Sequence, residues 1–235
     1  MELKIGSRML CALHSLMLWR LPTPTDAIAF AAWEADALGS WCSRCGVSLR
    51  CSATGADGAC AECRGRQFAY HAVTRLGSYH DPLDVWVRMI KSRGWKAMAE
   101  HLGMMLAARA PPVDIVVPVP MHRIRREVRG IDHAGELARA IAVALDVPVC
   151  YALTQKLAAR QMGASRTARL LNTQRFQLSR AASSLAGARI ALVDDVRTTG
   201  STLQSAAAQL RDVGVTRIEA LVVAVRDPVP EEEDL

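Results

Sequence analysis

The sequence predicts an α/β fold: an open, mainly parallel twisted sheet flanked by helices, with a small cysteine-rich module before it. Three observations support this prediction. Apolar runs at 113–120 and 190–193 are typical of strands buried on both faces of a parallel sheet. Stretches with apolar residues at helical spacing separate them. Two Cys-x2-Cys pairs lie within residues 41–68, a segment with little else to bury.

Composition sets the broad class of the protein. With 235 residues and 51% hydrophobic content, the chain can bury a core as one main domain with a small appendage. The net charge is +6, and the four acids at 231–234 contribute −4, so the remainder carries +10 and favours phosphate-bearing partners. No run of eighteen apolar residues exists, which predicts no membrane span. Seven cysteines with two close pairs favour metal binding in a reducing compartment over disulfides.

Residues 1–40 are predicted to form an N-terminal helical extension. The apolar stretch at 9–19 follows Lys4 and Arg8 and so imitates a signal peptide. His14 interrupts this stretch, and no small-x-small cleavage site follows closely. We therefore expect a helix packed on the body of the protein or on a partner. An alanine-rich helix is expected at 26–38, after a proline-containing break.

Residues 41–68 are predicted to be a zinc ribbon. Zn²⁺ takes four sulfur ligands tetrahedrally, and each Cys-x2-Cys turn presents two sulfurs from one tight loop. The fourteen residues between the two pairs offer almost nothing to bury, so the segment needs a metal to fold. A thioredoxin-like redox motif would lack its usual strand–helix surroundings and would not explain two pairs. We predict structural zinc held by Cys42, Cys45, Cys60 and Cys63.

The main domain is predicted to span residues 69–227, followed by an acidic tail at 228–235 that is too polar to fold. Its polar and basic stretch at 154–173 favours a mobile loop over a site. Lys91 falls in a predicted helix break at 91–96, and a basic loop is expected at 121–130. Besides the run at 190–193, strands are expected at 73–79, 113–120, 149–153 and 217–225, and helices at 82–90, 98–108 and 132–145.

The stretch at 189–203 predicts a strand, a turn and a helix that starts near Ser201. Free amides and the positive end of the helix dipole then face one point and make an anion site. Two acids should stand at the solvent-facing end of the strand, where they would repel a phosphate unless hydroxyls such as a ribose diol donate to them. An ordinary capped strand–turn–helix is the plain alternative. The predicted sugar-phosphate residues are Asp194, Asp195, Thr198, Thr199, Gly200, Ser201 and Thr202.

This stretch resembles the phosphoribosyl-pyrophosphate (PRPP) motif of type I phosphoribosyltransferases. The wider order of motifs over 41–227 is similar to the ComF family of competence-associated proteins, and to GntX-type proteins: cysteine knuckles, a Lys-x-x-Gly element, Val-Pro-Val-Pro, a basic loop and the acid pair. The resemblance implies a type I phosphoribosyltransferase fold with an N-terminal zinc ribbon. It also implies a bacterial cytoplasmic protein associated with DNA uptake or with the use of DNA-derived nucleotides.

The resemblance further implies that PRPP or a ribose 5-phosphate nucleotide binds with Mg²⁺. The two acids would hold the ribose hydroxyls and the turn its 5-phosphate. Mg²⁺ would bridge pyrophosphate and ribose hydroxyls rather than sit in a protein cage. Two positions differ from the family pattern: Ile-Asp-His at 131–133 and Arg197. The residues implied for pyrophosphate are Lys91, Arg123 and Arg129.

No catalytic residue is predicted. Thr198 stands where some purine-salvage relatives carry a carboxylate, and a hydroxyl does not accept a proton at neutral pH. His122 and His133 qualify for proton transfer only by residue type. Two functions stay open: a phosphoribosyltransferase of unknown acceptor, or a non-catalytic nucleotide-sensing module that contacts the DNA-uptake helicase or single-stranded DNA. Aromatic residues do not interleave with the basic run, which favours partner-mediated over direct DNA contact.

Overall fold

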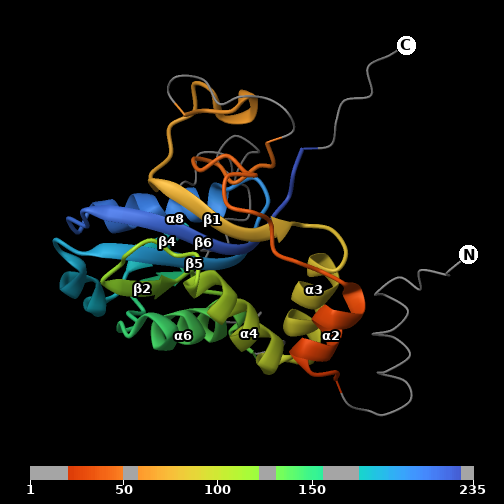
Figure 1. Cartoon of the computed structure of the whole chain (residues 1–235). Helices are drawn as coiled ribbons and strands as arrows, with labels where there is room; N and C mark the ends of the chain where they lie inside the picture. The colour runs from red at the N-terminus through yellow and green to blue at the C-terminus, as the bar shows by residue number, and fades with distance from the viewer. Residues whose placement is uncertain (1–20, 50–57, 122–130, 156–174, 229–235) are drawn as a thin grey trace, which may run out of the picture.

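The computed structural model describes residues 21–49, 58–121, 131–155 and 175–228, and its centre is a parallel sheet of four strands (Figure 1). The spatial order is β1-β6-β5-β2, and each neighbouring pair is parallel. A single parallel bridge between Val116 and Val149 extends the β2 edge. The strand bounds are β1 Ala72–Ser78, β2 Ile115–Pro118, β5 Arg189–Arg197 and β6 Arg217–Val225.

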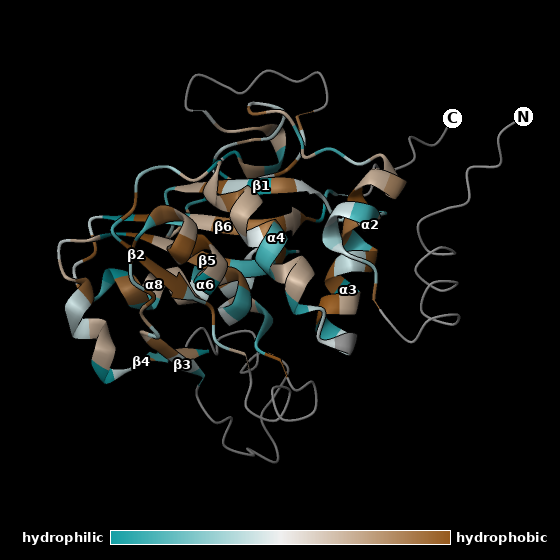
Figure 2. Ribbon diagram, turned by 60° about the horizontal axis from the view of Figure 1, so that its bottom comes forward, coloured by the Kyte–Doolittle hydropathy of each residue, from teal (hydrophilic) through white to brown (hydrophobic). Residues whose placement is uncertain are grey.

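Helices cover both faces of this sheet. Ala191 and Val193 of β5 belong to one buried cluster with residues of α3, α4 and α6, whereas Ile190 and Leu192 belong to a second with residues of α8. Successive strand residues point to opposite faces, so these clusters are the two faces of one sheet. Hydrophobic colour gathers on its strands (Figure 2). The helices are α3 Leu83–Arg93, α4 Lys96–Ala107, α6 His133–Leu145 and α8 Ser201–Arg211. The predicted fold class is confirmed.

A second, smaller sheet pairs β3 (Leu153–Gln155) with β4 (Phe176–Leu178) in antiparallel fashion. Gln155 Nε2 donates to the carbonyl of Pro120 over 2.9 Å, so this sheet is tied to the chain that follows β2. A short 3-10 helix, Arg180–Leu185, leads from β4 back to the large sheet. The mobile loop was predicted at 154–173, and from residue 156 onward it lies outside the described residues.

Three local expectations were wrong, each for a visible reason. The apolar strand does not end before the acids, because β6 continues alongside and pairs Asp194 with Val222. The helix break predicted at 91–96 is narrower: α3 runs through Lys91 to Arg93, ends where Gly94 adopts a left-handed conformation with φ 63°, and α4 begins at Lys96. The first described helix, α2 (Pro24–Ala31), is shorter than the helix predicted at 26–38. It ends early because the backbone adopts a left-handed conformation at Ala32.

The cysteine module is packed into the main core. Its four cysteines belong to the buried cluster on the α8 face of the sheet, and a 3-10 turn, Ala61–Cys63, carries the last of them. Trp41 Nε1 donates to the carbonyl of Val73 over 3.0 Å. Gly46 has φ 79°, and a Cβ there would approach Val73 Cγ1 to 2.8 Å, so only glycine fits this approach to the sheet. No described helix is long and apolar enough to cross a bilayer.

A buried arginine on β1 joins the separate parts of the chain. The Arg75 side chain is 1% exposed. It donates to Asp36 Oδ2 over 2.6 Å, to the Gly46 carbonyl over 2.7 Å and to Ser48 Oγ over 2.7 Å. A weaker contact of 3.4 Å reaches Asp227 Oδ1. One guanidinium thus links the segment before the cysteines, the cysteine module, the sheet and the chain after β6.

Replacing Arg75 by methionine is expected to destabilise the protein. The change keeps much of the volume but leaves partly buried carboxylates without their cation, which costs about 2–4 kcal/mol of unfolding free energy. Urea unfolding measures the difference. Arg211→Met in the exposed last turn of α8 is the control and should cost less than about 1 kcal/mol. Equal losses in the two variants would contradict the linking role of Arg75.

Candidate functional site

A cleft of about 360 Å³ lies at the carboxyl edge of the parallel sheet. Residues that follow β1, β2, β5 and β6 all reach it, because parallel strands end at the same edge. Open α/β sheets bind their ligands at this edge. The polar side chains that line the cleft belong to Tyr79, Lys91, His133, Asp194, Asp195, Thr198, Thr202 and Arg226.

The predicted phosphate turn forms one wall of the cleft. Gly200 has φ 80° and immediately precedes α8, so the free amides of the helix start point toward the turn. A Cβ at Gly200 would lie 3.0 Å from Arg197 Nε. The Thr199 hydroxyl donates to Ser201 Oγ over 3.1 Å. Thr198 and Thr202 line the cleft directly. The turn therefore combines a helix N-terminus with hydroxyl groups.

The acid pair lies beside this turn, and its two members differ. Asp194 is half-buried, whereas Asp195 is only 6% exposed. Oδ2 of Asp195 lies 2.7 Å from His133 Nε2 and 2.9 Å from Lys91 Nζ. Lys91, predicted to bind pyrophosphate, is thus ion-paired with an acid of the site. The expectation of two solvent-facing acids was wrong, because α3 and α6 cover Asp195.

Electrostatics separates the two carboxyl groups further. Burial and the nearby charge of Asp195 raise the pKa of Asp194 to about 7. Burial also disfavours ionisation of Asp195, but the hydrogen bond to His133 and the positive charges of His133 and Lys91 outweigh it. They lower the pKa of Asp195 to about 2. The pair therefore holds one fixed negative charge and one group that titrates near neutral pH.

Sequence reasoning missed the role of His133 and the two residues at the far end of the cleft. His133 is the first residue of α6, and Asp132 caps that helix by accepting from the Gly135 amide over 3.1 Å. The cap directs the histidine toward Asp195. Tyr79 and Arg226 follow the ends of β1 and β6. Their position directly after apolar strand runs was the available signal. His122, Arg123 and Arg129 lie outside the described residues.

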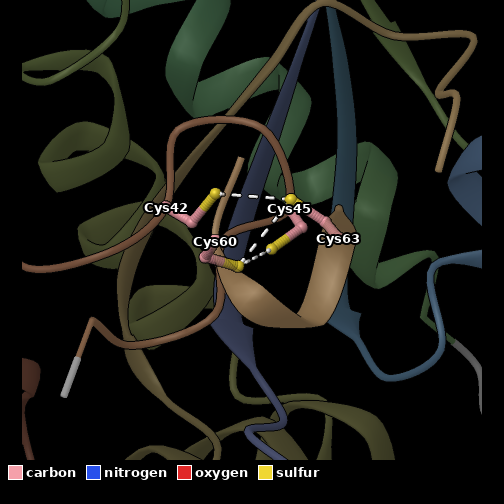
Figure 3. A group of neighbouring side chains, drawn as sticks. All are labelled: Cys42, Cys45, Cys60 and Cys63. Carbon is pink, nitrogen blue, oxygen red and sulfur yellow. Dashed lines mark hydrogen bonds between the residues drawn. The ribbon is translucent and has the colours of Figure 1, made fainter. Parts of the chain in front are cut away.

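The four predicted zinc ligands converge on one point (Figure 3). All four sulfurs lie within 4.8 Å of one another and are buried. The distance between Sγ atoms is 3.7 Å for Cys42 and Cys63, 3.5 Å for Cys45 and Cys60, and 3.7 Å for Cys60 and Cys63. Tetrahedral zinc with Zn–S bonds of 2.3 Å requires sulfur separations of about 3.8 Å. The cluster is compatible with structural zinc.

Burial favours the neutral thiol at two of these cysteines. It raises the pKa of Cys63 to about 11 and also raises the pKa of Cys45 well above its usual range. Zinc binds thiolates, so metal binding must displace these protons.

The Asp194→Asn variant should be stabilised relative to wild type as the pH rises. The folded pKa of Asp194, about 7, lies above its unfolded value of about 3.9. Ionisation therefore costs folding free energy above pH 7 but not below pH 4. We expect a relative gain of the order of 2 kcal/mol at pH 8, the equivalent of one to two pKa units, and little difference at pH 4. Urea unfolding at both pH values measures it.

Asp114→Asn is the control, because its pKa shift and therefore its expected stability change have the opposite sign. The hydrogen bond from Arg189 lowers the pKa of Asp114 to about 2. This variant should lose stability relative to wild type at pH 8 rather than gain it. A pH-independent difference for Asp194→Asn would show that its ionisation is not penalised in the folded protein.

Two curated proteins and one family model match this chain. The model of the phosphoribosyl transferase domain matches residues 127–235. Competence protein F of Haemophilus influenzae is 28% identical over 191 residues, which cover 76% of this chain and 82% of that protein. Competence protein ComFC of Bacillus subtilis is 35% identical over 100 residues, covering 43% and 39%.

Solved structures give more distant matches. The glutamine PRPP amidotransferase of B. subtilis, complexed with ADP and GMP, aligns with a TM-score of 0.41 at 23% identity, over 53% of this chain and 25% of that one. The purine phosphoribosyltransferase of Pyrococcus horikoshii aligns with a TM-score of 0.36 at 16% identity, over 58% of this chain and 80% of that one. The fold assignment rests on the domain match and the strand order. The predicted resemblance is thereby confirmed: the chain is similar to the competence proteins F and ComFC, and the phosphoribosyl transferase domain model matches its C-terminal part.

Proposed function

We propose that the cleft binds a ribose 5-phosphate unit, either as PRPP or as a nucleotide, and that the protein serves natural competence. One observation supports this most: the acid pair and the N-terminal turn of α8 line the same cleft. A sugar phosphate presents both groups that these residues could bind, a diol for the acids and a phosphate for the turn. The phosphoribosyl transferase domain and the names of the competence relatives point the same way.

The phosphate belongs at the turn. The start of α8 offers backbone amides, of which that of Ser201 donates to Thr199 Oγ1 over 3.3 Å, and the positive end of the helix dipole, which stabilises an anion. The left-handed Gly200 brings the backbone close to the ligand. Thr198 and Thr202 line the same cleft, and their hydroxyls can donate to phosphate oxygens; that of Thr202 also accepts from Arg175 over 2.9 Å.

The ribose belongs at the acids. Lys91 and His133 keep Asp195 ionised, so it accepts hydrogen bonds from hydroxyl groups rather than donating one. Asp194 lines the same cleft and becomes a second acceptor once it ionises. The acid pair also suits Mg²⁺, which is usually held by one or two carboxylates and substrate phosphates. Magnesium would supply charge neutralisation of the pyrophosphate.

Phosphoribosyl transfer to an unknown acceptor is the enzymatic form of this proposal. The adaptor alternative, a module for the DNA-uptake helicase or single-stranded DNA, is not better supported than ligand binding in the cleft. Pyrophosphate release from PRPP in the presence of each nucleobase distinguishes a transferase from a binding protein.

Removing the two cleft-lining hydroxyls should weaken ligand binding. We expect Thr198→Val/Thr202→Val, measured by calorimetry with ribose 5-phosphate and with PRPP plus Mg²⁺, to lose at least about tenfold in affinity, since hydrogen bonds to charged groups contribute about 1.5–3 kcal/mol each. Asp194→Asn should have a comparable effect at pH 8.

Thr216→Val is the matched control. Thr216 lies at the opposite edge of the sheet and donates to the Ala188 carbonyl over 3.0 Å, so its replacement should leave affinity unchanged. The proposal fails if the wild-type protein binds neither ligand at millimolar concentration.

The four-cysteine cluster is proposed to hold one structural zinc. Its donors are buried within the core that the cysteine module shares with the sheet, so the metal would stabilise both. It would supply no chemistry to the cleft, because a four-sulfur site leaves no open coordination position.

Metal analysis of protein purified without chelator should find about one zinc per chain. Cys42→Ser/Cys60→Ser should lose the metal and stability, whereas Cys150→Ser should keep both, because Cys150 is not one of the four clustered cysteines and its thiol hydrogen-bonds to the Ala181 carbonyl and the Ser184 hydroxyl. Lowering the pH should release the zinc as the thiolates are protonated. A full equivalent of zinc in the double variant would refute the ligand assignment.

A further inference from the structure

Tyr79 and Arg226 form a cation–π pair that lines the cleft. The Arg226 guanidinium carbon lies 5.4 Å from the centre of the Tyr79 ring, and both side chains line the cleft. Arg226 follows β6, which lies next to β5 and its acids, and Tyr79 follows β1, which lies two strands from β5; both strands are on the side away from β2. At strand spacing this is about 5–10 Å from the acids.

The neighbours of this pair are hydrogen-bonded to each other and to the cysteine module. Ser78 Oγ donates to Asp227 Oδ2 over 2.6 Å, which joins the residue before Tyr79 to the residue after Arg226. Ser48 donates its amide to Asp227 Oδ1 over 2.8 Å and its hydroxyl to Oδ2 over 2.7 Å. The Ser48 and Ser78 hydroxyls lie 3.0 Å apart. Ser48 therefore contacts both supports of the pair.

Ser48 is itself held in place by the cysteine module. Ser48 forms an antiparallel bridge with Trp41, and within the turn so closed the Cys42 amide donates to the Val47 carbonyl over 2.8 Å. This turn carries Cys42 and Cys45 of the four-cysteine cluster. The Ser48 hydroxyl also accepts from Arg75 over 2.7 Å. The position of Ser48 thus depends on the module and on the buried arginine together.

We propose that Ser48 and Asp227 are positioning residues through which the cysteine module sets the Tyr79–Arg226 pair, and that this pair receives the nucleobase of a nucleotide. An aromatic ring and a guanidinium both present planar faces on which a base stacks. The inference rests on the proposed function, because it requires ribose and phosphate at the acids and the turn. A base joined to that ribose would extend away from the turn by about the distance to the pair.

Calorimetry on the full-length chain tests this with two probes. Ribose 5-phosphate lacks a base, and a panel of AMP, GMP, CMP and UMP supplies one. Ser48→Ala and Asp227→Asn should weaken the tightest-binding nucleotide about fivefold, while affinity for ribose 5-phosphate stays within about twofold. Arg226→Gln should reproduce this pattern, and Ser48→Thr should restore wild-type affinity because it keeps the hydroxyl.

Ser43→Ala is the matched control within the same module. The Ser43 side chain is exposed, and its backbone carbonyl accepts from the Val73 amide, so both affinities should be unchanged. Zinc content and melting temperature, measured on every variant, show whether the module itself is intact. Equal weakening of both probes in Ser48→Ala overturns the positioning role, and so does unchanged nucleotide affinity.

The wild-type protein separates this inference from the proposed function. If nucleotides bind no more tightly than ribose 5-phosphate, the base contact is refuted while the ribose-phosphate site stands. If ribose 5-phosphate does not bind at all, the proposed function fails, and this inference fails with it.

Discussion

The architecture depends on the buried guanidinium of Arg75. A cation that is 1% exposed is tolerated only when carboxylates and carbonyls surround it, and here they come from the N-terminal segment, the cysteine module and the end of β6. Because the three segments must all be present to satisfy one charge, none can shift alone. The cleft inherits this constraint: Asp227, which contacts Arg75, directly follows Arg226 and accepts a hydrogen bond from Ser78, the residue before Tyr79.

The acid pair shows how neighbouring carboxylates acquire different roles. Asp194 and Asp195 are adjacent in the chain, but α3 and α6 reach only the second with a lysine and a histidine. The charge of Lys91 and the hydrogen bond with His133 stabilise one negative charge, and that charge then disfavours a second. A ligand therefore meets one permanent acceptor and one whose protonation depends on pH. This asymmetry arises from tertiary packing, since the two residues are chemically identical.

Much of this molecule was predictable from local pattern. Apolar runs predicted the four strands of the large sheet, helical spacing predicted α4, α6 and α8, and cysteine spacing predicted the four-sulfur cluster. The small sheet was not predicted: the short strand expected at 149–153 lies at Leu153–Gln155, and β4 was not expected at all. The pattern could not give what depends on distant partners. The continuation of β5 through its acids required knowing that β6 lies beside it. The pairing of His133 and Lys91 with Asp195 joins residues from three elements, and no spacing rule relates them. The packing of the cysteine module against the core was likewise not predictable, because it depends on contacts between residues distant in sequence, such as Gly46 with Val73.

The position of β6 in the sheet has a consequence for biosynthesis. This strand lies between β1 and β5, yet it is the last of the described strands to leave the ribosome. Until it emerges, β1 has no strand partner among the described elements, and the cysteine module lacks the Val225 contact and the Asp227 carboxylate that complete its packing. Pairings so remote in sequence are slow to form. Nascent chains would therefore wait with exposed strand edges, open to chaperones, until the final strand inserts and closes sheet, module and cleft in one step.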